Sequence, residues 1–85
     1  MDRAEDELDA KAAAELDAKA AARRACRTGH AREVRERYGA LLREGAGVVG
    51  VSPSTFSRWE RGLVRPTGKA AERYGHLLAL WEGKP

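Results

Sequence analysis

An octapeptide occurs twice in succession near the start of the chain, ELDAKAAA at residues 7–14 and again at residues 15–22. Alanine has the highest intrinsic helix propensity, and in each copy a glutamate precedes a lysine by four residues, a pair that stabilises a helix by about 0.2–0.5 kcal/mol. Acids gather before the repeat and arginines follow it, as the helix dipole favours, and Gly29 suits a left-handed stop. The sequence therefore predicts one helix over about residues 3–27.

The role of this helix stays open on sequence grounds. An eight-residue period turns the repeated features by about 80° per copy, so no straight seam forms. The row Leu8, Ala12, Leu16 and Ala20 gives only a thin apolar stripe, and the large a and d residues of a sustained coiled coil are missing. Three readings remain: a mostly solvated helix that docks through its last turns, a dimerisation helix, or an acidic mask over a basic face.

Charge divides the chain in two. Residues 1–22 carry seven acids and three bases, a formal charge of −4, whereas residues 23–85 carry thirteen bases and six acids, a formal charge of +7. The later part should present a positive field to a polyanion, and nucleic acid is the expected partner.

The chain's 85 residues have room for one small core. The single cysteine, Cys26, has no intrachain disulfide partner, so a reducing cytoplasm is expected. The longest apolar run, residues 77–81, is far shorter than the roughly 20 residues of a membrane span, and no apolar signal segment follows Met1. A chain that is soluble, cytoplasmic and without a membrane partner is the expectation.

From His30 onward the apolar spacing is that of short helices. Helices are predicted over residues 30–38, about 41–49, 53–61 and about 68–81, with stops at Gly39, Gly50 and Gly62 and caps at Ser52 and Thr67. The predicted inward faces comprise Ala31, Val34, Arg35 and Tyr38; Leu42, Ala46 and Val49; Phe56, Trp59 and Leu63; and Ala70, Tyr74, Leu77, Leu78 and Trp81. No strand pattern is present. The predicted fold is all-α: a compact four-helix domain at residues 30–82, preceded by the Ala-rich helix of residues 1–29 and followed by a tail at residues 83–85.

A small residue at Ala46, a turn glycine at Gly50 and apolar residues at 49, 51, 56 and 59 keep the spacing of a helix-turn-helix. The run GVSPSTFSRWERG at residues 50–62, followed by RPTGKAAERYGHLL from Arg65, resembles the lambda-repressor-like or Cro-type (XRE) family of phage and bacterial regulators. The resemblance covers about residues 30–81. It implies a phage or actinobacterial type of transcription regulator, nucleoid-associated or in the host cytoplasm, whose third domain helix enters the major groove.

The predicted recognition helix has a distinct outward face. A core face through Phe56, Trp59 and Leu63 leaves six residues outward: Pro53, Ser54, Thr55, Ser57, Arg58 and Arg61. Arg58 alone among them can fork onto guanine O6 and N7, a contact that discriminates by about 1–3 kcal/mol, whereas Arg61 suits a phosphate.

The resemblance implies roles for particular residues. Base contacts are expected at Pro53, Ser54 and Arg58. Contacts to the DNA sugar-phosphate backbone are expected at Arg43, Ser52, Thr55, Ser57, Arg61 and Arg65. For the small hydroxyl residues the alternative is that they only cap the helix or contact solvent. The resemblance also sets Glu60 against Arg35 as a structural ion pair that clamps the first and third domain helices.

The second domain helix departs from the family pattern. Leu42 replaces a glutamine that commonly contacts a phosphate, so Arg43 and the helix N-terminus are left to supply that contact. Gly45 and Gly47 each cost about 1 kcal/mol relative to alanine, so this helix is expected to be soft in the free protein. Gly47→Ala is predicted to raise the melting temperature.

Enzymatic and metal-binding classes are not favoured. There is no phosphate-binding glycine loop, the serines at 52, 54 and 57 have no activating neighbour in sequence, and Cys26, His30 and His76 lack metal-ligand spacing. No enzyme activity, cofactor or metal is expected.

Two function classes remain. The first is a sequence-specific repressor or Cro-like regulator of double-stranded operator DNA, acting as a dimer or as successively loaded monomers. A homodimer would form through the N-terminal helix or through Leu80 and Trp81. The alternative is an interaction adaptor or antitoxin-like partner-binding protein, whose binding would lack the salt dependence of DNA association. The acidic-mask reading predicts tighter nonspecific DNA binding after deletion of residues 1–22.

Overall fold

The computed structural model describes residues 3–83, with side chains described from Asp9 onward. This part of the chain is all-helical and contains five helices: α1 (Arg3–Thr28), α2 (His30–Tyr38), α3 (Leu42–Val49), α4 (Pro53–Glu60) and α5 (Gly68–Trp81). The all-α prediction is confirmed, and the bounds agree with the expected ones to within a residue. Of the expected tail, only Gly83 lies among the described residues.

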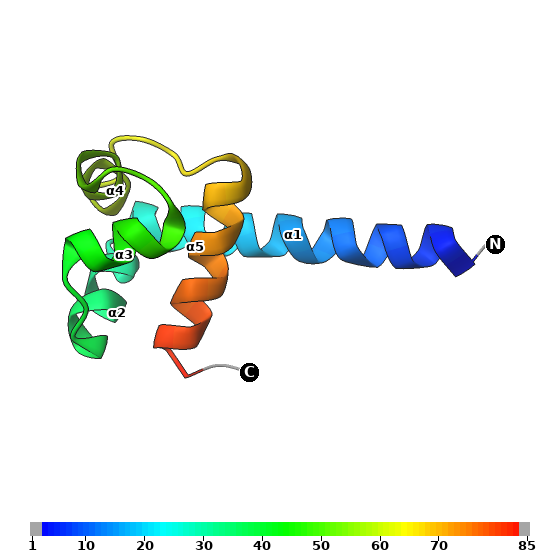
Figure 1. Ribbon diagram of the computed structural model, residues 1–85, viewed down its shortest axis with the longest axis horizontal. Coiled ribbons are helices and arrows are strands. Elements are labelled where there is room, and N and C mark those ends of the chain that lie inside the picture. The colour runs from blue at the N-terminus through cyan, green and yellow to red at the C-terminus, as the bar shows by residue number, and fades with distance from the viewer. Residues whose placement is uncertain (1–2, 84–85) are drawn as a thin grey trace.

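Helix α1 has two differently placed halves. Its first half projects away from the rest of the molecule, and the four shorter helices gather around its second half (Figure 1). From Ala18 onward α1 contributes Ala22, Ala25 and Cys26 to the same core as the later helices. The core therefore extends across the expected boundary at residue 29.

The second half of α1 crosses α5 at very short range. A Cβ atom placed on Gly75 would lie only 2.0 Å from the carbonyl oxygen of Ala18, so no larger residue fits the crossing. Leu16, two residues earlier and therefore on a different face, is 61% exposed. Docking thus begins at Ala18. Of the thin stripe considered in the sequence, Leu8 lies outside the residues with described side chains.

An aromatic cluster anchors α4 against α5. The ring centroids of Phe56 and Trp59 lie 4.8 and 5.7 Å from that of Tyr74, and all three side chains are buried. The rings fix the rotation of α4 about its own axis, because aromatic pairs at these separations add to the free energy of burial.

Two residues predicted to face the core lie largely at the surface. Leu63 is 64% exposed because α4 ends at Glu60, and Gly62, with φ of +71°, turns the chain before the helical face continues. Tyr38 is 58% exposed because it is the last residue of α2, although its ring centroid still lies 5.8 Å from that of Trp81.

The two glycines within α3 have different surroundings. A Cβ on Gly45 would lie 2.9 Å from Phe56 Cζ and 3.1 Å from Trp81 Cη2, whereas a Cβ on Gly47 would meet no atom within 4 Å. Gly45 is required for close packing, and Gly47 lies in open space. The sequence predicted that both glycines weaken this helix. The structure shows that they differ in packing, because only Gly45 has close neighbours.

Candidate nucleic-acid interface

Helix α4 is held at its start by the cap that the sequence predicts. Ser52 Oγ accepts a hydrogen bond from the backbone N–H of Thr55 at 3.1 Å and donates one to Thr55 Oγ1 at 3.0 Å, and Pro53 occupies the first helical turn. Both hydroxyl groups therefore have a structural role in the free protein. Thr67, by contrast, stands at the cap position of α5 without a side-chain cap bond.

Four of the six residues predicted to face outward are exposed. Pro53, Ser54, Arg58 and Arg61 are exposed, while Thr55 and Ser57 are half-buried at the flanks. Ser54 and Arg58 are four residues apart and share one face of the helix. Neither side chain makes a hydrogen bond or an ion pair with any part of the chain that the structure describes.

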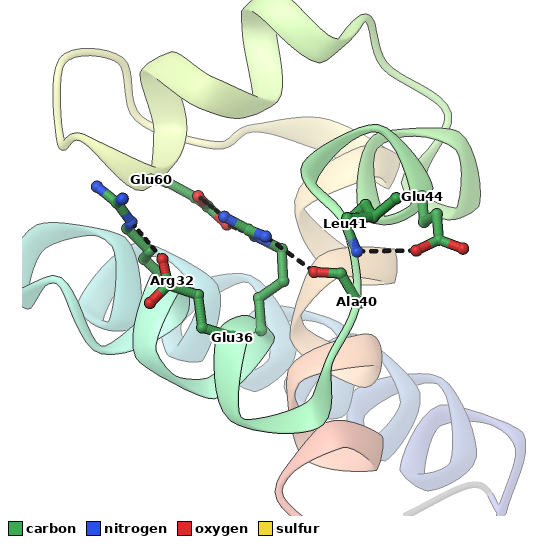
Figure 2. Close-up of polar contacts among 7 residues, drawn as sticks. Arg32, Glu36, Ala40, Leu41, Glu44 and Glu60 are labelled. Carbon is green, nitrogen blue, oxygen red and sulfur yellow. Dashed lines mark hydrogen bonds and ion pairs between the residues drawn. The ribbon is translucent and has the colours of Figure 1, made fainter.

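The base of α4 is fixed by the buried pair of Arg35 and Glu60. Arg35 Nε donates to Glu60 Oε2 at 2.6 Å and Arg35 Nη2 donates to Glu60 Oε1 at 3.0 Å, which makes a two-bond fork (Figure 2). Arg35 Nη1 also donates to the carbonyl of Ala40 at 2.9 Å. The hydrogen bonds to Glu60 raise the pKa of Arg35 above its ordinary value despite its burial.

This pair joins three parts of the fold: α2, the last turn of α4 and the turn between α2 and α3. The side chains of Arg35 and Glu60 are 10% and 3% exposed. Because each charge is desolvated, removing one partner would leave the other unpaired and cost about 3–5 kcal/mol. The pair thus holds α4 in position, and Glu60 has its charge compensated within the core.

Further exposed arginines lie on the segments that flank α4 in the chain. Arg43 is exposed on the first turn of α3, Arg61 is exposed at the end of α4, and Arg65 is exposed in the loop before α5. None of the three forms an ion pair with a described residue.

Several polar contacts were not foreseen in the sequence. The carboxylate of Glu44 accepts a hydrogen bond from the Leu41 backbone N–H at 2.8 Å and caps α3 (Figure 2). Arg23 Nε donates to the carbonyl of Pro66 at 2.9 Å. The Glu44 contact has a local signal, an acid three residues after the cap position. The Arg23 contact joins residues 43 apart and has none.

The thiol of Cys26 and the metal-ligating side chains were considered in the sequence as further candidate sites. Cys26 is buried, and desolvation raises the pKa of its thiol to about 11, so the thiol stays protonated at neutral pH. No group of three or more His, Cys, Asp or Glu side chains within the described residues could hold a metal ion. Between residues 3 and 83 no helix combines the length and the apolar character that a membrane span requires.

Comparison with other proteins does not identify the chain: no family model, no curated protein and no solved structure matches it.

Proposed function

We propose that the protein is a sequence-specific DNA-binding regulator in which α3 and α4 form a helix-turn-helix and α4 enters the major groove. The observation that carries this proposal is the two-sided character of α4. Phe56 and Trp59 are buried on one side, whereas Ser54 and Arg58 on the other side are exposed and have no polar partner among the described residues. An exposed short helix of this kind is suited to direct reading of base edges.

The charge around α4 supports the same proposal. Four arginines are exposed and form no ion pair with a carboxylate of the described residues: Arg43, Arg58, Arg61 and Arg65. The charge of Glu60 is compensated by Arg35. Arginines in this position can neutralise phosphates and release counterions. If about 4–6 phosphates are contacted per monomer, log affinity falls against log salt with a slope near −4 to −5.

A binding-site selection followed by a variant pair tests the proposal. Arg58→Ala is expected to lose about 1–3 kcal/mol of discrimination between the selected duplex and one with a changed base pair. Arg37→Ala is a matched control, because Arg37 is exposed on α2 and has no ion-pair partner among the described residues. The proposal fails if Arg58→Ala binds the selected duplex as well as the unchanged protein does.

The protein is proposed to read a two-fold repeat as a homodimer. Leu80 is 64% exposed and Tyr38 is 58% exposed beside the half-buried Trp81, which gives an apolar patch at the end of α5. The projecting half of α1 presents one large apolar side chain, Leu16, among its described residues. The contact at Leu80 and Trp81 is therefore the favoured one. A selected site in mirrored halves, with a monomer produced by Leu80→Glu, would support this arrangement.

The same apolar patch is the observation that favours the alternative function, an interaction adaptor. Adaptor binding would be retained in high salt, and the expected DNA association would not. Binding of duplex DNA with a flat salt response would replace the first proposal with the second.

A further inference from the structure

We infer that α1 carries a second DNA contact, a pocket that holds a backbone phosphate beside the groove read by α4. This inference rests on the proposed function. The pocket lies between the last turns of α1 and the loop after α4, has a volume of about 270 Å³ and is lined by three arginines, Arg23, Arg27 and Arg65. It is called the arginine pocket below.

Three of the seven residues that line the arginine pocket are arginines, and none of the three forms an ion pair with a described residue. Its remaining lining residues include Cys26, Gly62 and Pro66, and no acidic residue is among them. Glu60 lies near Cys26, but its carboxylate is paired with Arg35. Three arginines that line one pocket can turn their guanidinium groups to the same anion, and charge-assisted hydrogen bonds of this kind are strong.

The pocket is already organised in the free protein. Arg23 is half-buried, and its Nε donates to the Pro66 carbonyl at 2.9 Å, so its guanidinium ties α1 to the loop. Gly62 also packs against the backbone of α1, since a Cβ on Gly62 would be 3.6 Å from the Cys26 carbonyl oxygen. The Arg23 side chain therefore needs little further ordering on binding, whereas Arg27 and Arg65 are exposed and would be ordered by the phosphate.

The position of the pocket identifies DNA as the source of the phosphate. Gly62, on the pocket wall, follows Arg58 by four residues, and the Arg58 carbonyl accepts a hydrogen bond from the Leu63 N–H at 2.9 Å. The pocket therefore begins about one helical turn beyond the arginine proposed to read a base. Arg61 lies between them and is exposed. A duplex seated on α4 would bring a strand's phosphates to this end of the helix.

The neighbouring arginine of α1 provides a matched control. Arg24 is exposed and lines a different groove, between α1 and α5, where Asp17 and Glu82 are also present. Arg27→Ala and Arg24→Ala remove the same charge from the same helix. Arg23 is left unchanged because its bond to Pro66 is structural.

The test measures the affinity for the selected duplex between 50 and 200 mM salt, with thermal melting to show that both variants fold as the unchanged protein does. Arg27→Ala is expected to make the slope of log affinity against log salt less steep by about 0.9, so that affinity falls about 3.5-fold less across this range. It should weaken binding to selected and random duplexes alike. Arg24→Ala should keep the original slope.

The outcomes separate this inference from the proposed function. If the unchanged protein binds the selected duplex and Arg27→Ala matches Arg24→Ala, the arginine pocket is not a DNA contact and the function of α4 stands. If the unchanged protein shows no salt-dependent DNA binding, both proposals are overturned. Calorimetric titration with inorganic phosphate identifies a third result: loss of phosphate binding in Arg27→Ala with an unchanged DNA slope would make the pocket a site for a free anion and overturn the inference.

Discussion

The two copies of ELDAKAAA are identical in sequence and differ in environment. In the first copy, every residue from Asp9 to Ala14 is exposed. In the second copy, Ala18 is 8% exposed and Ala22 is fully buried in the core. Both copies are helical throughout. Helix formation here is therefore a local property of the sequence, and burial is not.

What differs between the copies is the partner helix. Helix α5 crosses α1 at the second copy, where Gly75 faces the backbone of Ala18. The small alanine side chains permit the close approach, and Gly75 completes it. Most of the first copy projects beyond α5 (Figure 1), and its last alanine, Ala14, lines the groove beside α5 while remaining exposed. An alanine-rich helix face can therefore be either exposed or buried, and which of the two occurs depends on whether another helix packs against it.

The largest expected effect comes from placing the same charge at equivalent positions of the two copies. Ala22→Glu would bury an unpaired carboxylate and cost more than about 4 kcal/mol, a large part of the total stability of so small a domain. Ala14→Glu, in the first copy, should change stability by no more than about 0.5 kcal/mol. Urea denaturation of the two variants makes the measurement. Equal midpoints would show that the second copy is not docked.

The crossing itself can be tested from the other side. Gly75→Ala should cost about 3 kcal/mol or more, because the new methyl group meets backbone atoms of α1, which cannot move aside as a side chain could. A melting temperature close to that of the unchanged protein would contradict the close approach of α1 and α5.

Gly45 and Gly47 offer the same comparison within α3, with a smaller effect. Gly47→Ala should stabilise by about 1 kcal/mol and raise the melting temperature by roughly 4–8 °C, because it improves helix propensity and meets no neighbour. Gly45→Ala is the control and should destabilise, since its methyl group would press on Phe56 and Trp81. A lowered melting temperature for Gly47→Ala would show that the space beside it is filled.

The smallest effect is expected from removing the first copy. The acidic-mask reading called for deletion of residues 1–22, but that deletion would remove Ala18 and Ala22 from the core, so the deletion must end at residue 14. The projecting half of α1 points away from α4 (Figure 1), and at physiological salt the interaction between exposed charges is screened over roughly 8 Å. Stability and nonspecific DNA affinity should both stay unchanged at 0.15 M salt. Tighter DNA binding would support the mask.

The sequence predicted most of the helical bounds because they depend on local signals. Gly29, Gly39 and Gly50 all adopt the left-handed conformation that ends a helix, and Ser52 makes its predicted cap bond. The buried pair of Arg35 and Glu60 was expected from the family resemblance, and the structure brings the two side chains together.

Contacts between distant segments could not be predicted in this way. The docking of Ala18 and Ala22 depends on where α5 crosses, and the exposure of Leu63 depends on where α4 ends. The arginine pocket joins Arg23 and Arg27 to a loop some 40 residues later. In the sequence, these arginines were interpreted as basic residues that stabilise the C-terminal end of a helix through the helix dipole. That effect is the same on every face of α1, so it does not indicate which face packs against the loop.

The burial of Cys26 has a practical consequence for spectroscopy. Because this thiol is 3% exposed and its pKa is raised to about 11, it should not react with maleimide reagents near neutral pH. A cysteine introduced at Ala10, on the exposed projecting rod, would then be the sole site of labelling. A fluorophore there, paired with one at a duplex end, would report the direction in which the rod leaves the complex.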